Sequence, residues 1–394
     1  MSDVFIVRAK RTAVGKIGGI LATQRPEVLA ASVIKEIVAG LPFPEIDGVV
    51  LGNAVGEGGN IARLSLLESG LPVDVPGVTV DVQCGSGLEA IIVAARHIQA
   101  GDGDVYLAGG VESTSLEPKR IAANMNGNRR EWHETIERAR FSPESLGDPD
   151  MAEAAENVAE QRKIGRDAQD EYTAESYRRA WAAEQQGLFR DEKIAAHRDL
   201  ADEGIRQMPD RLLKRVPPLY NGGTVTAANS CAKSDGAALV LLMSKQACVR
   251  YRMKPMLAFV DAARAGYDPH FASMSPVPAI RKLLAKQKRN LSDIDLIELN
   301  EAYAVQMVAL QQELGLDKEK LNVSGGALAI GHPYGASGAI NVCRLASEMK
   351  RRDAKLGLSA IGAAGGLGIA ALFANVSSVS GKRSKISRNR NSCF

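Results

Sequence analysis

The sequence predicts an α/β protein in which two similar β-α halves are joined by an inserted, mostly helical segment. Three observations lead to this prediction. Short apolar stretches of strand type alternate with longer helical patterns, a second series with the same order begins near Met256, and residues 150–190 are charged and strongly helical in pattern. With 394 residues, 45% of them hydrophobic, the chain is long enough to bury a large core.

The two halves alternate predicted strands with predicted helices in the same order. In the first half we expect strands over residues 4–7, 48–51, 78–82 and 105–108, and helices over residues 26–39 and 88–100. In the second half we expect strands over residues 257–260, 296–299, 322–324 and 356–361, and helices over residues 279–287 and 336–351. Repetition of the pattern suggests an internal duplication.

An offset of 248 residues supports the duplication. It takes Asp47 to Asp295, within the similar stretches 45–53 and 293–300, and it takes Cys84 to His332. If the halves pack about a pseudo-twofold axis, the turns that carry Cys84 and His332 face each other, and a base comes within reach of a thiol. The alternative is a chance alignment of a weak repeat.

These patterns divide the chain into four parts. We expect an N-terminal half over residues 1–115, to which residues 230–255 return, and a C-terminal half over residues 256–375. Residues 116–229 form an inserted loop domain, or cap, with solvated helical faces. Residues 376–394 have no apolar period and are predicted to be a mobile tail.

Composition argues against several classes of partner. A net charge of +3 without a run of Lys and Arg among aromatic residues argues against nucleic acid. Five cysteines, at positions 84, 231, 248, 343 and 393, are too widely spaced for a zinc site or a disulfide framework and suit a reducing compartment. The sequence shows no stretch that could cross a membrane and no cleavable signal, so we expect a cytoplasmic protein without membrane association.

Cys84 lies at the point where a β-branched stretch is followed by small residues and then by a helical pattern. At such a turn, free N–H groups and the positive end of the helix dipole favour the thiolate, which is the reactive form. Gly85 and Gly87 would let a substrate carbonyl approach the backbone closely. The alternative is an ordinary core cysteine that packs as a small hydrophobe.

Seven short motifs follow one another along the chain with consistent spacing. They are Arg11-Thr12 with Gly15 and Gly18-Gly19, Cys84-Gly85-Ser86-Gly87, Gly109-Gly110-Val111-Glu112-Ser113, Ala155-Glu156-Asn157-Val158-Ala159, Gly223-Thr224-Val225-Thr226-Ala227, Asn300-Glu301-Ala302-Tyr303-Ala304 and Gly331-His332-Pro333. In these motifs the chain resembles the thiolases, enzymes that form or cleave 3-ketoacyl-coenzyme A. The resemblance spans about residues 4–375 and implies the thiolase fold, layered α-β-α-β-α.

The resemblance implies roles for the central residues. Cys84 matches the nucleophile that is acylated, and His332 matches the histidine that activates it and donates toward a thioester oxygen. Asn300 matches the asparagine that holds a water in a first oxyanion hole. The backbone N–H groups of Cys84 and of the turn around Ala364 match a second hole. For His332 the alternative is a hydrogen-bonded core histidine, and for Asn300 it is a helix cap.

The resemblance also implies substrate contacts and an assembly. Met151, Ala228, Cys231 and Arg215 match positions that lie along coenzyme A, with a plain glycine-rich loop or a solvated basic face as the alternatives. Coenzyme A and acyl-coenzyme A would be substrates rather than permanently bound cofactors, and no metal is expected. We expect a homodimer or a homotetramer.

The family pattern breaks at two positions. Thiolases place a second cysteine in a glycine-rich turn near the C-terminus, where it moves a proton to or from the second substrate, and here that position is Gly362. A general acid-base group contributes on the order of 10²–10⁴ in rate. The family's loop histidine before Met151 is replaced by Asp150, either a substitute base or an exposed loop aspartate.

The first functional hypothesis is therefore an acyl-coenzyme A acyltransferase of the thiolase type, acting through an acyl-Cys84 intermediate as acetyl-CoA C-acetyltransferase or 3-ketoacyl-CoA thiolase. The second hypothesis is that Gly362 weakens the carbon–carbon step, so that the protein hydrolyses thioesters or transfers acyl groups to another acceptor. The third hypothesis is a non-catalytic acyl-coenzyme A binding protein. Retention of Cys84, His332 and Asn300 together argues against the third.

Overall fold

The N-terminal half is an alternation of strands and helices, as its apolar pattern predicts. The computed structural model describes residues 3–41, 45–126 and 129–376. Its first elements are β1 (Val4–Arg11), β2 (Gly15–Lys16), α1 (Pro26–Val38), β3 (Gly48–Gly52), α2 (Ile61–Ser69), β4 (Gly77–Val80), α3 (Ser86–Ala100) and β5 (Val105–Ser113). Strand β8 (Ser234–Ser244) lies between β1 and β5 in the sheet, and α7 (Lys245–Arg250) follows it.

The C-terminal half follows the same order. It consists of β9 (Leu257–Gly266), α8 (Pro276–Lys286), β10 (Leu296–Leu299), α9 (Ala304–Leu314), α10 (Ala327–Ile330), α11 (Tyr334–Arg352), β11 (Leu356–Ala363) and β12 (Leu367–Asn375). Between the halves stand β6 (Arg120–Asn126), β7 (Arg129–Ile136), α4 (Met151–Arg162), α5 (Arg166–Gln185) and α6 (Asp210–Arg215).

The sheet order reveals the duplication. The strands run β10-β11-β12-β9-β1-β8-β5-β3-β4, and from the β9–β1 contact outward each side pairs antiparallel, antiparallel and then parallel. Three residue pairs, between Val4–Ile6 and 257–259, join the two sides. The duplicated architecture predicted from the sequence is confirmed.

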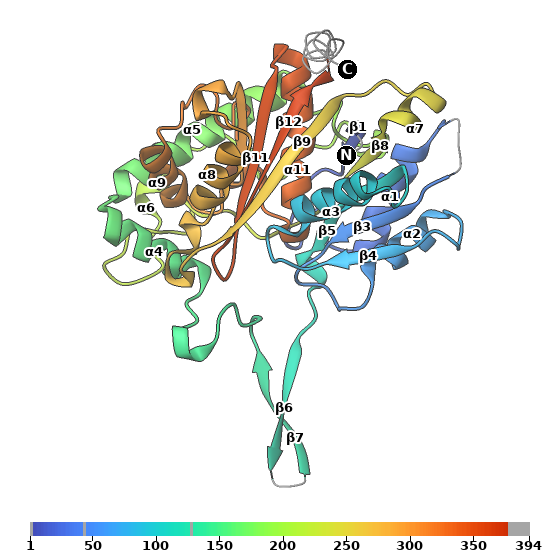
Figure 1. Ribbon diagram of the computed structural model, residues 1–394. Coiled ribbons are helices and arrows are strands. Elements are labelled where there is room, and N and C mark those ends of the chain that lie inside the picture. Colours follow the sequence, from blue (N-terminus) through green and yellow to red (C-terminus); the bar gives the residue numbers. More distant parts are fainter. Residues whose placement is uncertain (1–2, 42–44, 127–128, 377–394) are drawn as a thin grey trace, which may run out of the picture.

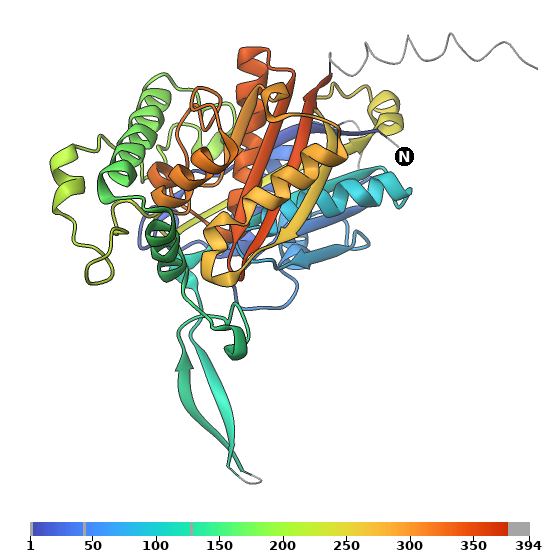
Figure 2. The same cartoon turned by 60° about the vertical axis from the view of Figure 1, so that its left-hand side comes forward.

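Helices cover both faces of this strongly twisted sheet (Figure 1). Helices α3 and α11 pack against each other and against strands of both halves in one central core. Helices α1 and α2 cover the outer face of the N-terminal strands, and α8 and α9 cover the outer face of the C-terminal strands. The layers therefore read α-β-α-β-α, as expected, with α3 and α11 between the strands of the two halves. Figure 2 shows the twist of the sheet from a second side.

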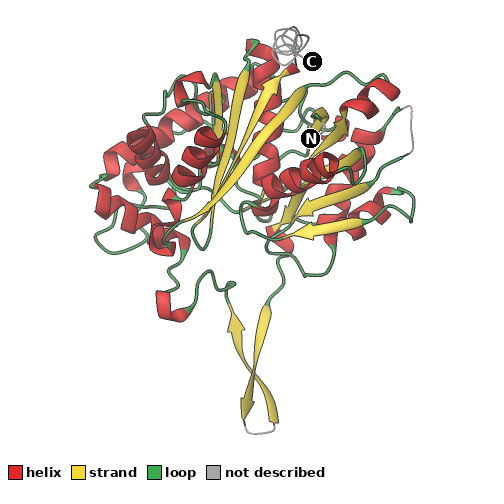
Figure 3. Cartoon of the chain, viewed as in Figure 1, coloured by secondary structure: helices red, strands yellow, loops and turns green. Residues whose placement is uncertain are grey.

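The inserted segment is not only helical. Besides α4, α5 and α6 it contains the β6–β7 hairpin, which projects away from the body of the molecule (Figure 3). The helical pattern of residues 150–190 is confirmed by α4 and α5. The exact division of the chain at residues 115, 229 and 255 stays a prediction.

The predicted strand over residues 322–324 is wrong. Leu321 makes a single bridge with Ile297, and the chain then turns at Asn322, which has a φ of 43°. The Asn322 side chain takes the place of a strand, because its Oδ1 accepts from Leu299 N and its Nδ2 donates to Leu299 O, both at 2.8 Å. An asparagine that bonds backbone in this way competes with regular pairing.

Helices α2 and α9 and strand β12 were not among the expected elements. Apart from Val376, the predicted tail over residues 376–394 lies outside the described residues. Within the described ranges, every helix is too short or too polar to cross a membrane.

Candidate active site

Helices α3 and α11 bring the Cys84 and His332 turns together. Cys84 lies two residues before α3, and His332 lies two residues before α11. The first turns of the two helices touch, because a Cβ built on Gly87 would lie only 2.6 Å from the carbonyl oxygen of Gly335. Backbones approach this closely only where side chains are missing. The pairing of the two turns, expected from the repeat offset, follows from this crossing.

The Cys84 turn is held in an unusual conformation. Gln83, the preceding residue, has a φ of 55°, in the left-handed region that non-glycine residues rarely adopt. Ser86 braces it, because its Oγ donates to Gln83 O at 2.6 Å and accepts from Val82 N at 2.9 Å. A strained residue that its surroundings over-determine often marks a functional position.

The Cys84 thiol is protonated in the resting protein. Burial raises its pKa to about 12, and the carboxylates of Glu112 and Asp81 act in the same direction. The backbone N–H groups of Cys84 and Ala364 act against this rise by hydrogen bonding to the sulfur. The backbone N–H groups of the turn favour the thiolate, as expected, but desolvation outweighs them and raises the pKa of the thiol.

His332 is neutral and presents Nε2 as a base. Only 1% of the residue is exposed, and burial lowers its pKa to about 3. Its Nδ1 lies 2.6 Å from Ser337 Oγ, whose single proton is donated to Pro333 O at 3.0 Å. With the Ser337 proton on Pro333 O and the Asn300 amide N–H groups beside Nε2, the contacts fit the tautomer that has Nδ1–H and a lone pair on Nε2. A neutral histidine in this tautomer can take a proton from a thiol.

Asn300 lies beside that base. Its Nδ2 is 3.4 Å from His332 Nε2, and its Oδ1 has no hydrogen-bond partner among the described residues. Helix α9 begins only at Ala304, with Tyr303 in the cap position, so Asn300 is not the cap of that helix. Its amide is placed to bind a small polar group next to Nε2.

Cys231 lies between the Asn300 segment and the His332 turn. Its N–H donates to Ala302 O at 2.9 Å, and the carbonyl of the next residue, Ala232, accepts from His332 N at 2.9 Å. Burial raises the pKa of Cys231, and the charge of a Cys84 thiolate raises it further. The structure thus places a second thiol within electrostatic reach of Cys84.

The remaining predicted contacts are more scattered. Met151 is the first residue of α4, and Arg215 is the exposed last residue of α6. Ala228 lies two residues after Thr226, and its N–H donates to Thr226 Oγ1 at 3.2 Å. Asp150 is a half-buried cap rather than an exposed loop aspartate, because its side chain accepts from two N–H groups of α4 and from Tyr220 OH, each at 2.8 Å.

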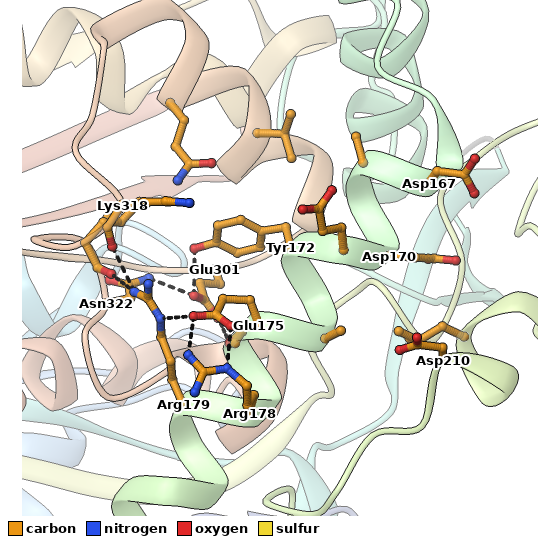
Figure 4. A pocket seen from close by; sticks show the side chains of 18 of the residues that line it. Asp167, Asp170, Tyr172, Glu175, Arg178, Arg179, Asp210, Glu301, Lys318 and Asn322 are labelled. Carbon is orange, nitrogen blue, oxygen red and sulfur yellow. Dashed lines mark hydrogen bonds and ion pairs between the residues drawn. The ribbon is translucent and has the colours of Figure 1, made fainter.

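A cleft of about 860 Å³ lies between α5, α6 and α9 (Figure 4). Glu301 lines it, and its buried carboxylate accepts from Tyr172 OH at 2.9 Å, Asn322 Nδ2 at 2.9 Å and Ser176 Oγ at 2.6 Å. These contacts anchor the backbone next to Asn300. The described residues that line this cleft do not include Cys84 or His332.

Sequence reasoning missed Ser337, which sets the tautomer of His332. The only available signal was a hydroxyl five residues after the histidine, near one turn of the following helix. Glu112, whose carboxylate accepts from Gly335 N and Ala54 N at 3.0 Å, was noticed only as part of a motif. Among the described residues, no group of three His, Cys, Asp or Glu side chains could hold a metal ion.

Comparison with known proteins identifies relatives along the whole chain. The family models "Thiolase, N-terminal domain" and "Thiolase, C-terminal domain" match residues 4–246 and 253–375. The putative acetyl-CoA C-acetyltransferase YhfS of Bacillus subtilis is 46% identical over 376 residues, covering 94% of this chain and 99% of that protein. The putative acetyl-CoA C-acetyltransferase VraB of Staphylococcus aureus is 44% identical over 380 residues, covering 95% and 99%.

Solved structures agree with these relatives. The Bacillus anthracis acetyl-CoA acetyltransferase superposes with a TM-score of 0.88 at 35% identity, covering 95% of this chain and 99% of that chain. Human mitochondrial 3-ketoacyl-CoA thiolase in complex with CoA superposes with a TM-score of 0.88 at 33% identity, covering 95% and 98%.

Proposed function

The chain belongs to the thiolase family and is an acyltransferase, and from this premise we propose that it transfers acyl groups from coenzyme A thioesters through a covalent thioester on Cys84. The observation that carries the proposal is the meeting of the Cys84 turn, the Nε2 lone pair of His332 and the Asn300 amide at one crossing of two buried helices.

In this proposal the resting pair is neutral. His332 Nε2 takes the Cys84 proton as the sulfur attacks the thioester carbonyl, so charge forms only when substrate is present. The N–H groups of Cys84 and Ala364 already point at the sulfur and would stabilise the oxyanion of the tetrahedral intermediate. Met151, Ala228, Cys231 and Arg215 are proposed to lie along coenzyme A, and the active protein is proposed to be a cytoplasmic homodimer or homotetramer.

Intact-mass and peptide mass spectrometry after incubation with acetyl-coenzyme A test the intermediate. We expect one acetyl group on the peptide that contains Cys84, and none in Cys84→Ala. The matched control is Cys248→Ala, which removes another buried thiol in α7 and should leave the label intact. A folded wild-type protein that gains no acetyl group contradicts the proposal.

Gly362 supports a second candidate function, in which acylation is retained and the carbon–carbon step is weak. The protein would then hydrolyse thioesters or pass the acyl group to another acceptor. Thiolysis of acetoacetyl-coenzyme A, followed by loss of the enolate absorbance, separates the two: thiolysis faster than hydrolysis favours the thiolase reaction, and hydrolysis without thiolysis favours the second candidate. Tight binding of acyl-coenzyme A without any turnover would point to a binding protein.

A further inference from the structure

Position 362 has no side chain, yet two buried polar groups converge on the point where a side chain would begin. Gly362 belongs to β11, two residues before Ala364, whose N–H reaches the Cys84 sulfur. A Cβ built on Gly362 would lie 3.0 Å from Ser275 Oγ and 3.2 Å from Gln306 Nε2. The space that a longer residue at 362 would fill is thus occupied by a hydroxyl from another segment.

The Ser275 hydroxyl makes no hydrogen bond to the described residues. Ser275 is fully buried at the start of α8. Leaving a buried hydroxyl unsatisfied costs roughly 1–3 kcal/mol, so such a group calls for an explanation. Its side chain does not cap α8, which would have been the simplest structural role.

Gln306 is oriented toward the same point. Its Oε1 accepts from Ala302 N at 3.1 Å, which fixes which end of the amide faces Gly362. The Nε2 end of the amide therefore faces position 362, where a Cβ would lie 3.2 Å from it. The Ser275 hydroxyl at the same position has no described partner, so its proton and its lone pairs are both available there.

Resting on the proposed function, we propose that Ser275 is a further catalytic residue, which carries the proton to and from the substrate α-carbon in place of an acid-base side chain at position 362. Cys231, the second thiol near Cys84, is the competing candidate for the same step.

The proton balance of the cleavage direction is simple. The Cys84 sulfur bonds to the acyl carbon, the bond between the α- and β-carbons breaks, and its electron pair stays on the α-carbon. The Ser275 O–H bond breaks as the α-carbon–hydrogen bond forms, and the oxygen regains a proton from solvent water. The imidazolium of His332, which holds the former Cys84 proton, restores that water. In sum, one proton moves from Cys84 to the α-carbon.

The test compares Ser275→Ala with Ser273→Ala, a matched control that removes another fully buried hydroxyl without a described partner two residues earlier. We expect Ser275→Ala to keep acetylation of Cys84, while thiolysis of acetoacetyl-coenzyme A and deuterium exchange from D₂O into the acetyl-coenzyme A methyl group both fall roughly a hundredfold. Ser273→Ala should keep all three, and Ser275→Cys should keep the exchange, because a thiol at that place can also carry a proton.

Several outcomes would overturn the assignment. They are unchanged exchange in Ser275→Ala, an equal loss in Ser273→Ala, loss of exchange in Cys231→Ala while Ser275→Ala retains it, or a wild-type protein that is acetylated but shows neither exchange nor thiolysis. Failure of the wild type to be acetylated at Cys84 is a different result, because it contradicts the proposed function itself.

Discussion

At the scale of single residues, burial rather than the helix dipole controls the resting state of the Cys84–His332 pair. Both side chains are held neutral, since desolvation raises the pKa of the thiol and lowers that of the imidazole. A thiol that stays protonated resists alkylation and oxidation until a substrate arrives. In the proposed mechanism, proton transfer from Cys84 to His332 generates the thiolate only when a thioester is bound.

Alkylation of Cys84 tests this state. The thiolate fraction rises tenfold per pH unit below the pKa, so with a pKa of about 12 the rate with iodoacetamide should rise about tenfold per unit from pH 7 to pH 10 without a plateau. His332, with a pKa of about 3, adds no inflection in that range. A plateau near pH 8.5–9, the behaviour of an ordinary exposed cysteine, would contradict the protonated resting state.

Ser337 is expected to influence acylation indirectly, through its contact with His332. Ser337→Ala removes the acceptor of His332 Nδ1–H, so the tautomer with a free Nε2 loses its support. We expect the rate of Cys84 acetylation to fall by roughly 10²-fold with little change in KM, because Ser337 is not proposed to contact substrate. Ser65→Ala, which removes a buried hydroxyl in α2, is the matched control and should leave the rate unchanged. A KM effect without a rate effect would reject this role.

At the scale of elements, the crossing of α3 and α11 brings the Cys84 turn and the His332 turn together. Close contact is possible because Gly87 of α3 and Gly338 of α11 carry no side chains at the interface. A methyl group at Gly338 would lie 2.5 Å from Leu88 N, so the helices would have to separate. These glycines therefore serve the packing of the two helices.

Substitution at the crossing should uncouple the turns. Gly87→Ala forces the backbones apart, and overpacking of this kind costs about 1–3 kcal/mol. We expect a lower thermal midpoint and an acetylation rate reduced beyond what the lost folded fraction explains. Gly266→Ala is the control, because a Cβ there meets no atom of the described residues within 4 Å. Full activity in a destabilised Gly87→Ala would show that the crossing does not position the site.

At the scale of the whole molecule, one buried ion network ties three parts of the chain together. Arg11 of β1 bonds Glu192 and Asp202 of the inserted segment, each at 2.8 Å, and Arg344 of α11 bonds Glu192 at 3.0 Å. All four side chains are nearly inaccessible to solvent. Breaking a buried pair leaves an uncompensated charge, so the network holds both halves to the insertion.

Removal of one member tests that role. Arg11→Met leaves Glu192 and Asp202 short of a partner, and we expect the free energy of unfolding to fall by about 3–5 kcal/mol in urea titrations. Arg178→Met, which breaks an exposed pair with Glu175, should cost at most about 1 kcal/mol. Equal losses in the two variants would mean that the buried network contributes no more than a surface pair.

The network also predicts acid sensitivity. Burial acts to raise the pKa of both carboxyl groups, but Arg344 and Arg11 beside Glu192, and Arg11 and Lys193 beside Asp202, hold both pKa values below the ordinary 4.5 and 3.8. A lowered pKa gives stability that is complete above the ordinary value and is lost as the pH falls below it. The thermal midpoint of the wild type should therefore drop steeply below about pH 4.5, and the drop should be shallower in Arg11→Met.

Strand and helix alternation and the duplication could be read from the sequence, because periodicity, motifs and a constant offset are local or repetitive signals, and the same offset predicts that Cys84 acts with His332. Only the folded chain shows that burial raises the pKa of Cys84 and lowers that of His332, that Ser337 Oγ lies beside His332 Nδ1, and that Ser275 lies beside Gly362. Asn322, expected in a strand, likewise turns to bond Leu299 through its side chain. Desolvation and through-space contact depend on which segments pack together, and no local pattern in the chain encodes that.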